Sequence, residues 1–99
     1  MIRGTTPTHV FTTDVDLSDA SVVYVTYAQG SLKLEKTKDD LTFTDKGFEV
    51  KLSQKETLAF KAMGASAEVQ IRARYEDGTA VASNVIVVPI SKIIKGGVI

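Results

Sequence analysis

Residues 67–76 alternate apolar and polar side chains almost without interruption and lead directly into Asp77 and Gly78. The segment reads AEVQIRARYE, and a period of two residues is that of a β-strand with one face in water. Four side chains share its apolar face: Val69, Ile71, Ala73 and Tyr75. Asp-Gly after such a strand is a strong hairpin signal. The segment therefore predicts an all-β protein with antiparallel strands.

The register of this hairpin has two solutions. A two-residue turn at residues 77–78 places Asn84 on the core face of the returning strand. A bulge near residues 82–84 shifts the parity and turns Val85 and Val87 inward instead. In both solutions the end of the returning strand is apolar on both faces. This pattern predicts a strand that is central in its sheet or covered on its second side.

Other segments of the chain show the same β pattern and are separated by turn residues. The predicted strands are residues 8–13, 21–28, 32–37, 41–44, 48–52, 67–76 and 79–90. Such strands at a spacing of roughly 8–12 residues are typical of antiparallel sandwiches and barrels. We predict a single domain, residues 1–99, with the fold of an immunoglobulin-like antiparallel β-sandwich of about seven strands. The Cys…Trp…Cys signature of antibody domains is absent, because the chain has neither residue type.

The segment SQKETLAFKAM, which begins at Ser53, breaks the β pattern. Ser53 and Glu56 fit a capping box, in which a serine hydroxyl and a glutamate carboxylate accept backbone N–H groups at the start of a helix. We therefore predict one short helix near residues 53–62. It would cross one end of the fold and insert Leu58 and Phe60 into the core.

The charge balance and the missing residue types exclude several classes of protein. The chain has 12 basic and 12 acidic residues, whereas a nucleic-acid binder usually carries a basic excess. Without cysteine it can form neither disulfides nor thiolate metal sites. No segment approaches the ~20 apolar residues of a membrane span. The first residues lack the apolar stretch of a signal peptide, so we expect synthesis in the cytoplasm of the host.

Candidate catalytic and metal-binding residues are few. His9 is the only histidine, and without cysteine partners we interpret it as a structural or surface residue. Asp14, Asp16 and Asp19 offer carboxylates that suit calcium, but their loop lacks the twelve-residue calcium-binding pattern, and a solvated turn is the alternative. No serine lies in a nucleophile elbow, and no glycines form a phosphate-binding loop. We predict that the protein is not an enzyme and uses neither a cofactor nor a metal.

The last ten residues, ISKIIKGGVI, contain five aliphatic side chains, which is unusual for a chain end. One interpretation is that the last strand continues along a sheet edge and packs Ile93 or Ile94 there. The other is that this segment donates a strand to a neighbouring subunit, or accepts one from it, by β-augmentation. The candidate partner contacts are Ile93, Ile94, Val98 and Ile99.

Four stretches of the chain resemble small proteins that are encoded in prophages of Gram-positive bacteria. They are the opening MIRGTTPTHVFT, the strand VYVTYAQ with the following LEKT, the segment SQKETLAF, and the ending ASNVIVVPISKIIKGGVI. The resemblance extends over essentially the whole chain. It implies a phage-encoded β-sandwich connected with the tail or baseplate module, and it carries no catalytic motif.

We therefore expect a non-enzymatic structural or interaction protein of a phage particle that acts through strand edges and its C-terminal segment. Its expected partners are other phage structural proteins or further copies of itself, and its expected location is the virion. The alternative is a carbohydrate- or cell-surface-binding module. That module would use the acidic loop at residues 14–19 and one tyrosine of the pair Tyr24 and Tyr27, which point to opposite faces of one strand. A small hydrolase or a cytoplasmic regulator is a third alternative.

Overall fold

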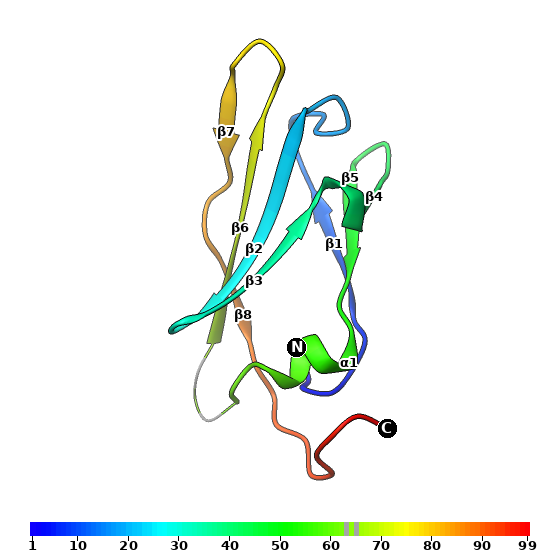
Figure 1. Ribbon diagram of the computed structural model, residues 1–99, viewed down its shortest axis with the longest axis vertical. Helices are drawn as coiled ribbons and strands as arrows, with labels where there is room; N and C mark the ends of the chain where they lie inside the picture. The colour runs from blue at the N-terminus through cyan, green and yellow to red at the C-terminus, as the bar shows by residue number, and fades with distance from the viewer. Residues whose placement is uncertain (63, 65) are drawn as a thin grey trace.

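The computed structural model describes residues 1–62, 64 and 66–99, and the described chain forms two antiparallel sheets that face each other (Figure 1). The strands are β1 (Thr8–Thr12), β2 (Val22–Gln29), β3 (Leu32–Thr37), β4 (Leu41–Phe43), β5 (Gly47–Lys51), β6 (Ser66–Arg74), β7 (Ala80–Ala82) and β8 (Ile86–Pro89). A 3₁₀ turn, η1 (Lys38–Asp40), and one short helix, α1 (Gln54–Leu58), complete the described elements. The predicted all-β, antiparallel class is confirmed.

The two sheets differ in width. The smaller sheet has the order β1-β5-β4, and the larger has the order β3-β2-β6-β7, with β8 also paired to β6 beyond the end of β7. In Figure 1 the larger sheet lies on the left and the smaller on the right, and α1 closes the lower end. Among the described residues, no helix has the length and apolar character that crossing a membrane requires.

The core lies between the sheets and is built by the alternation of strand side chains. Because successive side chains point to opposite faces, each central strand contributes every second residue. The largest fully buried side chains of the strands are Val23, Val25, Tyr27, Phe48, Val50 and Val69, and Leu52 and Phe60 join them from the segments beside α1. In β6 the predicted apolar face is confirmed, because Val69, Ile71 and Ala73 are all buried.

The hairpin between β6 and β7 has a three-residue turn, so the predicted two-residue turn is wrong. Gly78 has φ +92°, a left-handed conformation that glycine adopts without a steric penalty. Its N–H donates to the carbonyl of Tyr75 (3.0 Å), and the Tyr75 N–H donates to the carbonyl of Thr79 (2.8 Å). The extra turn residue moves the register by one position, so that Ala73 pairs with Val81.

The predicted bulge is present, but its effect on the side chains is the opposite of that expected. Ser83 lies beside Ile71, whereas Val69 pairs with Ile86, so the returning strand contains one extra residue. The bulge and the three-residue turn each exchange the inward and outward faces of the residues that follow, so their effects cancel. Ile86 therefore points inward, while Val85 and Val87 are exposed. The prediction of a central or covered strand is also wrong, because β7 and β8 form an edge of the larger sheet.

The capping box that starts α1 is confirmed. The Glu56 N–H donates to the Ser53 hydroxyl (3.1 Å), and the Ser53 N–H donates to the Glu56 carboxylate (2.9 Å). The helix ends at Leu58 and is shorter than predicted, because the N–H of Phe60 bonds to the carbonyl of Thr57 and the tightened turn directs Phe60 into the core. Met63, the last residue of the segment SQKETLAFKAM, lies outside the described residues.

Candidate interaction surface

The outer edge of β1 has backbone groups without strand partners. At the two ends of β1, the Leu52 N–H donates to the Pro7 carbonyl (3.0 Å) and the Thr13 N–H donates to the Lys46 carbonyl (3.0 Å). In an antiparallel pair, alternate residues direct their N–H and C=O groups toward the partner strand. The intervening residues therefore direct their N–H and C=O groups away from β5, toward a side on which no described strand lies. These residues are Thr8, Val10 and Thr12.

The side chains of β1 do not protect this edge. The strand reads THVFT, without a charged residue or a proline, and the outward side chain of Val10 is 67% exposed. Natural sheets usually blunt a free edge with charges, prolines, bulges or very short strands. Apart from its modest length, β1 has none of these devices, so it can pair with an additional strand.

Beside this edge lies a groove of about 450 Å³ between β1 and the strands β7 and β8, with both apolar and polar side chains in its lining. Its main apolar lining comes from both sheets and the loop after β1: Phe11, Val15, Leu17, Ile71, Val81 and Ile86. Ile86 faces the inner side of the larger sheet, yet its side chain is 40% exposed. The reason is that the smaller sheet ends at β1, and no described strand continues it over β7 and β8.

The other two sheet edges are protected. β3 carries Lys33 and Glu35 on its exposed face, and β4 has only three residues. Lys36 of β3 also forms an ion pair with Glu56 of α1, with 2.7 Å between Nζ and Oε2. Charges and shortness are the ordinary means by which a sheet edge avoids further pairing. The molecule therefore has a closed side, at β3 and β4, and an open side, where the free five-residue edge of β1 lies beside the partly covered inner face of β7 and β8.

The C-terminal segment does not continue as a strand along a sheet edge. Beyond Pro89, its one described β-bridge joins Ser91 to Ile2. Ile93 is half-buried, whereas the other three predicted contact residues are exposed: Ile94, Val98 and Ile99. Gln54 holds the segment through two hydrogen bonds: the Ile99 N–H donates to its Oε1 (2.9 Å), and its Nε2 donates to the Ile99 carbonyl (3.1 Å). A role of these residues in binding a partner stays a prediction.

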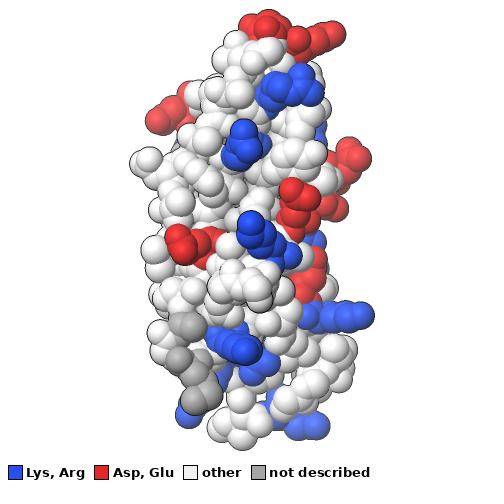
Figure 2. All heavy atoms as spheres, turned by 60° about the vertical axis from the view of Figure 1, so that its left-hand side comes forward, with Lys and Arg blue, Asp and Glu red and all other residues white. Residues whose placement is uncertain are grey.

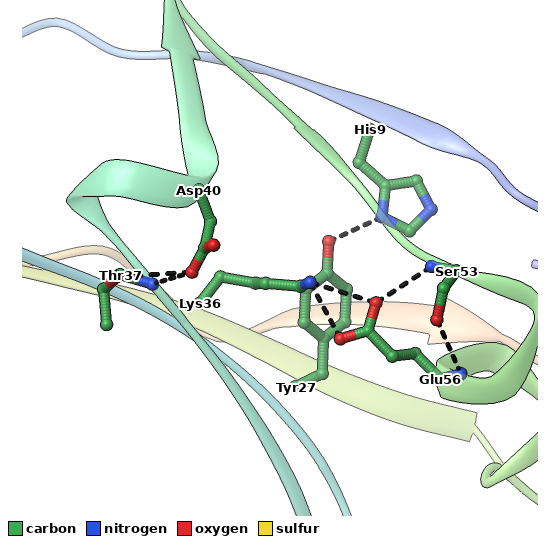
Figure 3. Close-up of polar contacts among 7 residues, drawn as sticks. All are labelled: His9, Tyr27, Lys36, Thr37, Asp40, Ser53 and Glu56. Carbon is green, nitrogen blue, oxygen red and sulfur yellow. Dashed lines mark hydrogen bonds and ion pairs between the residues drawn. The ribbon is translucent and has the colours of Figure 1, made fainter.

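His9 and Tyr27 form a contact between the two sheets (Figure 3). The His9 Nδ1 and the Tyr27 hydroxyl are 2.6 Å apart, and the tautomer of the ring sets which of them donates. Burial of the imidazole lowers the pKa of His9, and the positive amino group of Met1 lowers it further. Burial raises the pKa of the Tyr27 hydroxyl, and the nearby Glu56 carboxylate adds to that effect. Both groups are therefore neutral at pH 7, as in a structural contact.

The acidic loop after β1 is an ordered turn. The Asp16 carboxylate accepts hydrogen bonds from the N–H (2.9 Å) and the hydroxyl (2.6 Å) of Ser18, which lower the pKa of Asp16. Leu17 and Ala20 are buried and anchor the loop against the core. In the described part of the chain, no three His, Cys, Asp or Glu side chains come together in a way that could hold a metal ion.

The outer face of the larger sheet is polar and charged. Tyr24 is exposed on this face beside its cross-strand neighbour Arg72, whereas Tyr27 is buried, as the opposite orientation of the two side chains predicts. Figure 2 shows one face of the molecule on which basic and acidic side chains are interspersed, with uncharged surface between them. Charges of both signs are therefore mixed on this face of the molecule.

Sequence reasoning identified the C-terminal segment but missed the groove. The uncharged run THVFT was the available signal for an open edge, although only the sheet order shows that β1 is at an edge. Comparisons of the chain with protein-family models, with curated proteins and with solved structures found no match.

Proposed function

We propose that this protein is a non-enzymatic structural or interaction protein of a phage particle, associated with the tail or baseplate, that acts through strand-edge and C-terminal contacts. The phage context rests on the resemblance of four stretches of the sequence to prophage-encoded proteins. The mode of action rests on one observation, which is the unprotected edge of β1 beside a partly apolar groove.

The strand order supports an immunoglobulin-like form of the sandwich. If β1 to β7 are read as strands B to G, the smaller sheet has the order B-E-D and the larger has the order C′-C-F-G. In immunoglobulin domains, strand A also belongs to the sheet that contains B, E and D. No described strand of this chain occupies that place.

Mass spectrometry of phage particles tests the phage context. Particles would be purified from an induced lysogen that carries the gene, and the protein should be present at a fixed ratio to the tail proteins. Presence in the lysate with absence from the particles would contradict the proposed location.

Size-exclusion chromatography with light scattering tests the mode of action. We expect the full chain to self-associate as concentration rises, and we expect a variant that lacks residues 95–99 to remain monomeric. Two monomeric proteins that also fail to bind purified tail proteins would remove the support for an assembly role.

A carbohydrate- or cell-surface-binding module is the second candidate, because Tyr24 is exposed on a sheet face beside Arg72. Aromatic side chains with exposed faces can stack on apolar parts of a ligand. A glycan array, probed with and without calcium, tests this candidate, and silence in both arms would contradict it.

A further inference from the structure

We infer that the groove beside β1 accepts residues 94–99 of a second copy of this chain, which pair with β1 as a fourth strand of the smaller sheet. This inference rests on the proposed assembly function and names its acceptor, its donor and its partner. It joins two features that the fold leaves unsatisfied, which are the free backbone edge of β1 and the exposed aliphatic residues of the C-terminal segment.

The acceptor offers both hydrogen bonds and apolar surface to one added strand. Alternate residues of β1, which are Thr8, Val10 and Thr12, direct their N–H and C=O groups into the space where such a strand would lie. A strand in that place would also cover the inner side of β7 and β8, where Ile86 is 40% exposed. Main-chain bonds would supply affinity, and alternate side chains would fill the groove, as in other cases of β-augmentation.

The donor segment has the pattern and length that this place requires. In an extended conformation, Ile94, Gly96 and Val98 share one face, which would point into the groove, while Lys95 points to solvent. The glycine allows the donor backbone to approach the groove closely. At about 3.3 Å per residue, six residues span roughly 20 Å, which is enough to pair with the five-residue strand β1.

The charges of donor and acceptor are complementary. Asp14 is the one charged residue among those that line the groove. Residues 90–99 carry two basic side chains, Lys92 and Lys95, and no acidic side chain. A second copy therefore brings an aliphatic strand with positive charge to a groove that combines an apolar floor, from residues such as Phe11 and Ile86, with the negative charge of Asp14.

Little holds the donor in its present position. Ile94 is fully exposed, and the side-chain bonds of Gln54 to Ile99 lie at the surface, where water can replace them. Ile93 is half-buried, and its Cδ1 packs closely against Gly4. A Cβ added to that glycine would lie only 3.0 Å from the Ile93 Cδ1. Ile93 can remain there as the anchor while residues 94–99 extend away from the subunit.

The donor and the acceptor are different surfaces of the subunit. A contact between different surfaces is heterologous, so it generates head-to-tail chains, or rings where the rotation between neighbours closes. A dimer formed by two β1 edges would instead be symmetric, and its two subunits would use the same residues. Cross-linking can therefore distinguish the two arrangements.

Engineered cysteines provide the test, because the chain has none of its own. Val10→Cys and Lys95→Cys place thiols on the outward faces of the acceptor and the donor, both at exposed positions. The two variants would be mixed and mildly oxidised, and a mixture of Lys95→Cys and Thr42→Cys would be treated in the same way. We expect the first mixture to yield about tenfold more mixed disulfide dimers than the second, because docking raises the effective concentration of the thiols. Thr42 is the control, since it is exposed on β4 at the closed side.

Three outcomes would overturn the inference. Disulfide dimers of Val10→Cys with itself, without mixed dimers, would indicate that two β1 edges pair. In a variant that carries both Val10→Cys and Lys95→Cys, a disulfide within one chain would indicate that the segment fills its own groove. Mixed dimers no more abundant than those of the Thr42→Cys control would indicate random collision.

A peptide experiment separates failure of this inference from failure of the proposed function. A fluorescent peptide with the sequence of residues 90–99 should bind the variant that lacks residues 95–99, and a peptide with Ile94→Asp and Val98→Asp should bind at least about tenfold more weakly. Circular dichroism verifies that the truncated protein is folded. If the peptide does not bind but the full chain self-associates or is found in particles, the donor-strand inference fails and the proposed function stands. If the full chain does neither, the proposed function itself fails.

Discussion

The closed and open sides of this sandwich are built from the same kinds of strand, but they end in different ways. At the closed side, β3 ends the larger sheet with charged residues and an ion pair to α1, and β4 is too short to serve as a template. At the open side, β1 has an uncharged edge, and the inner side of β7 and β8 is only partly covered. The difference shows that protection of sheet edges is selective in this chain, and the open side is where an additional strand fits.

Replacement of the two isoleucines of the larger sheet that line the groove, one in β6 and one in β8, should have the largest effect. Ile71 is 6% exposed, so Ile71→Ala should lower the free energy of unfolding by about 2–4 kcal/mol through the cavity it leaves. Ile86 is 40% exposed, so Ile86→Ala should cost less than about 1 kcal/mol. Urea unfolding of the two variants at low protein concentration measures both values, and equal costs would indicate that the groove is filled within the subunit.

A charge placed on the open edge should weaken association. Val10→Lys introduces the device that protects β3, and we expect it to raise the dissociation constant of the self-association at least about tenfold. Thr42→Lys makes the same change at an exposed position of β4 and should leave the dissociation constant unchanged. Sedimentation at several concentrations measures both, and an equal loss in the two variants would show that association does not depend on the β1 edge.

Loss of the ion pair at the closed side should have a smaller effect. Glu56→Gln keeps a side chain that can still cap α1 but removes the charge that pairs with Lys36. We therefore expect the free energy of unfolding at pH 7 to fall by ~0.5–1 kcal/mol. Burial acts to raise the pKa of Glu56, but the hydrogen bond and charge of Lys36 and the bonds from Ser53 outweigh it and lower the pKa below 4.5. The contribution of the pair is therefore present above pH 4.5 and is lost as the pH falls through the lowered pKa.

Urea unfolding at pH 7 and pH 3 checks this prediction. The difference in the free energy of unfolding between Glu56→Gln and the unchanged protein should be smaller at the lower pH. Glu35→Gln is the control, because Glu35 is exposed on β3 and forms no ion pair among the described residues. A similar loss in both variants would mean that net charge, and not the pair, is responsible.

The smallest effect concerns His9 on the open side. Since burial lowers the pKa of His9, the unfolded chain binds a proton near pH 6.5 that the folded chain does not bind. The free energy of unfolding should therefore fall as the pH is lowered from 7 through 6.5, and by less than about 1 kcal/mol because the half-exposed ring keeps part of its hydration.

In His9→Gln this part of the pH dependence should disappear, which unfolding at pH 7, 6 and 5 can measure. His9 contacts the buried Tyr27 hydroxyl, and glutamine can retain a hydrogen bond there. An equal fall in the variant would assign the pH dependence to other groups.

The sequence predicted what depends on neighbouring residues. The period of two placed Val69 and Ile71 inward, and the spacing of Ser53 and Glu56 predicted the start of α1. It left open which face Ile86 would occupy, because the length of the turn at Gly78 and the position of the bulge each reverse the faces of the following residues.

The open side could not be derived from local patterns. An edge is defined by which strands do not pair, and the run THVFT would have the same sequence in the middle of a sheet. The groove likewise exists because one sheet is narrower than the other, which is a property of the whole fold. The aliphatic residues Ile94, Val98 and Ile99 were visible in the sequence, whereas the surface that suits them was not.

The separation of the C-terminal segment from the groove has a consequence for stoichiometry. In a linear series of subunits joined as we infer, every subunit but one has its groove filled, whatever the length of the series. The single empty groove marks one end and gives the series a polarity, so that a different protein with an apolar, alternating strand could stop it there. A closed ring has no empty groove, and its subunits should therefore unfold at a higher temperature than free ones.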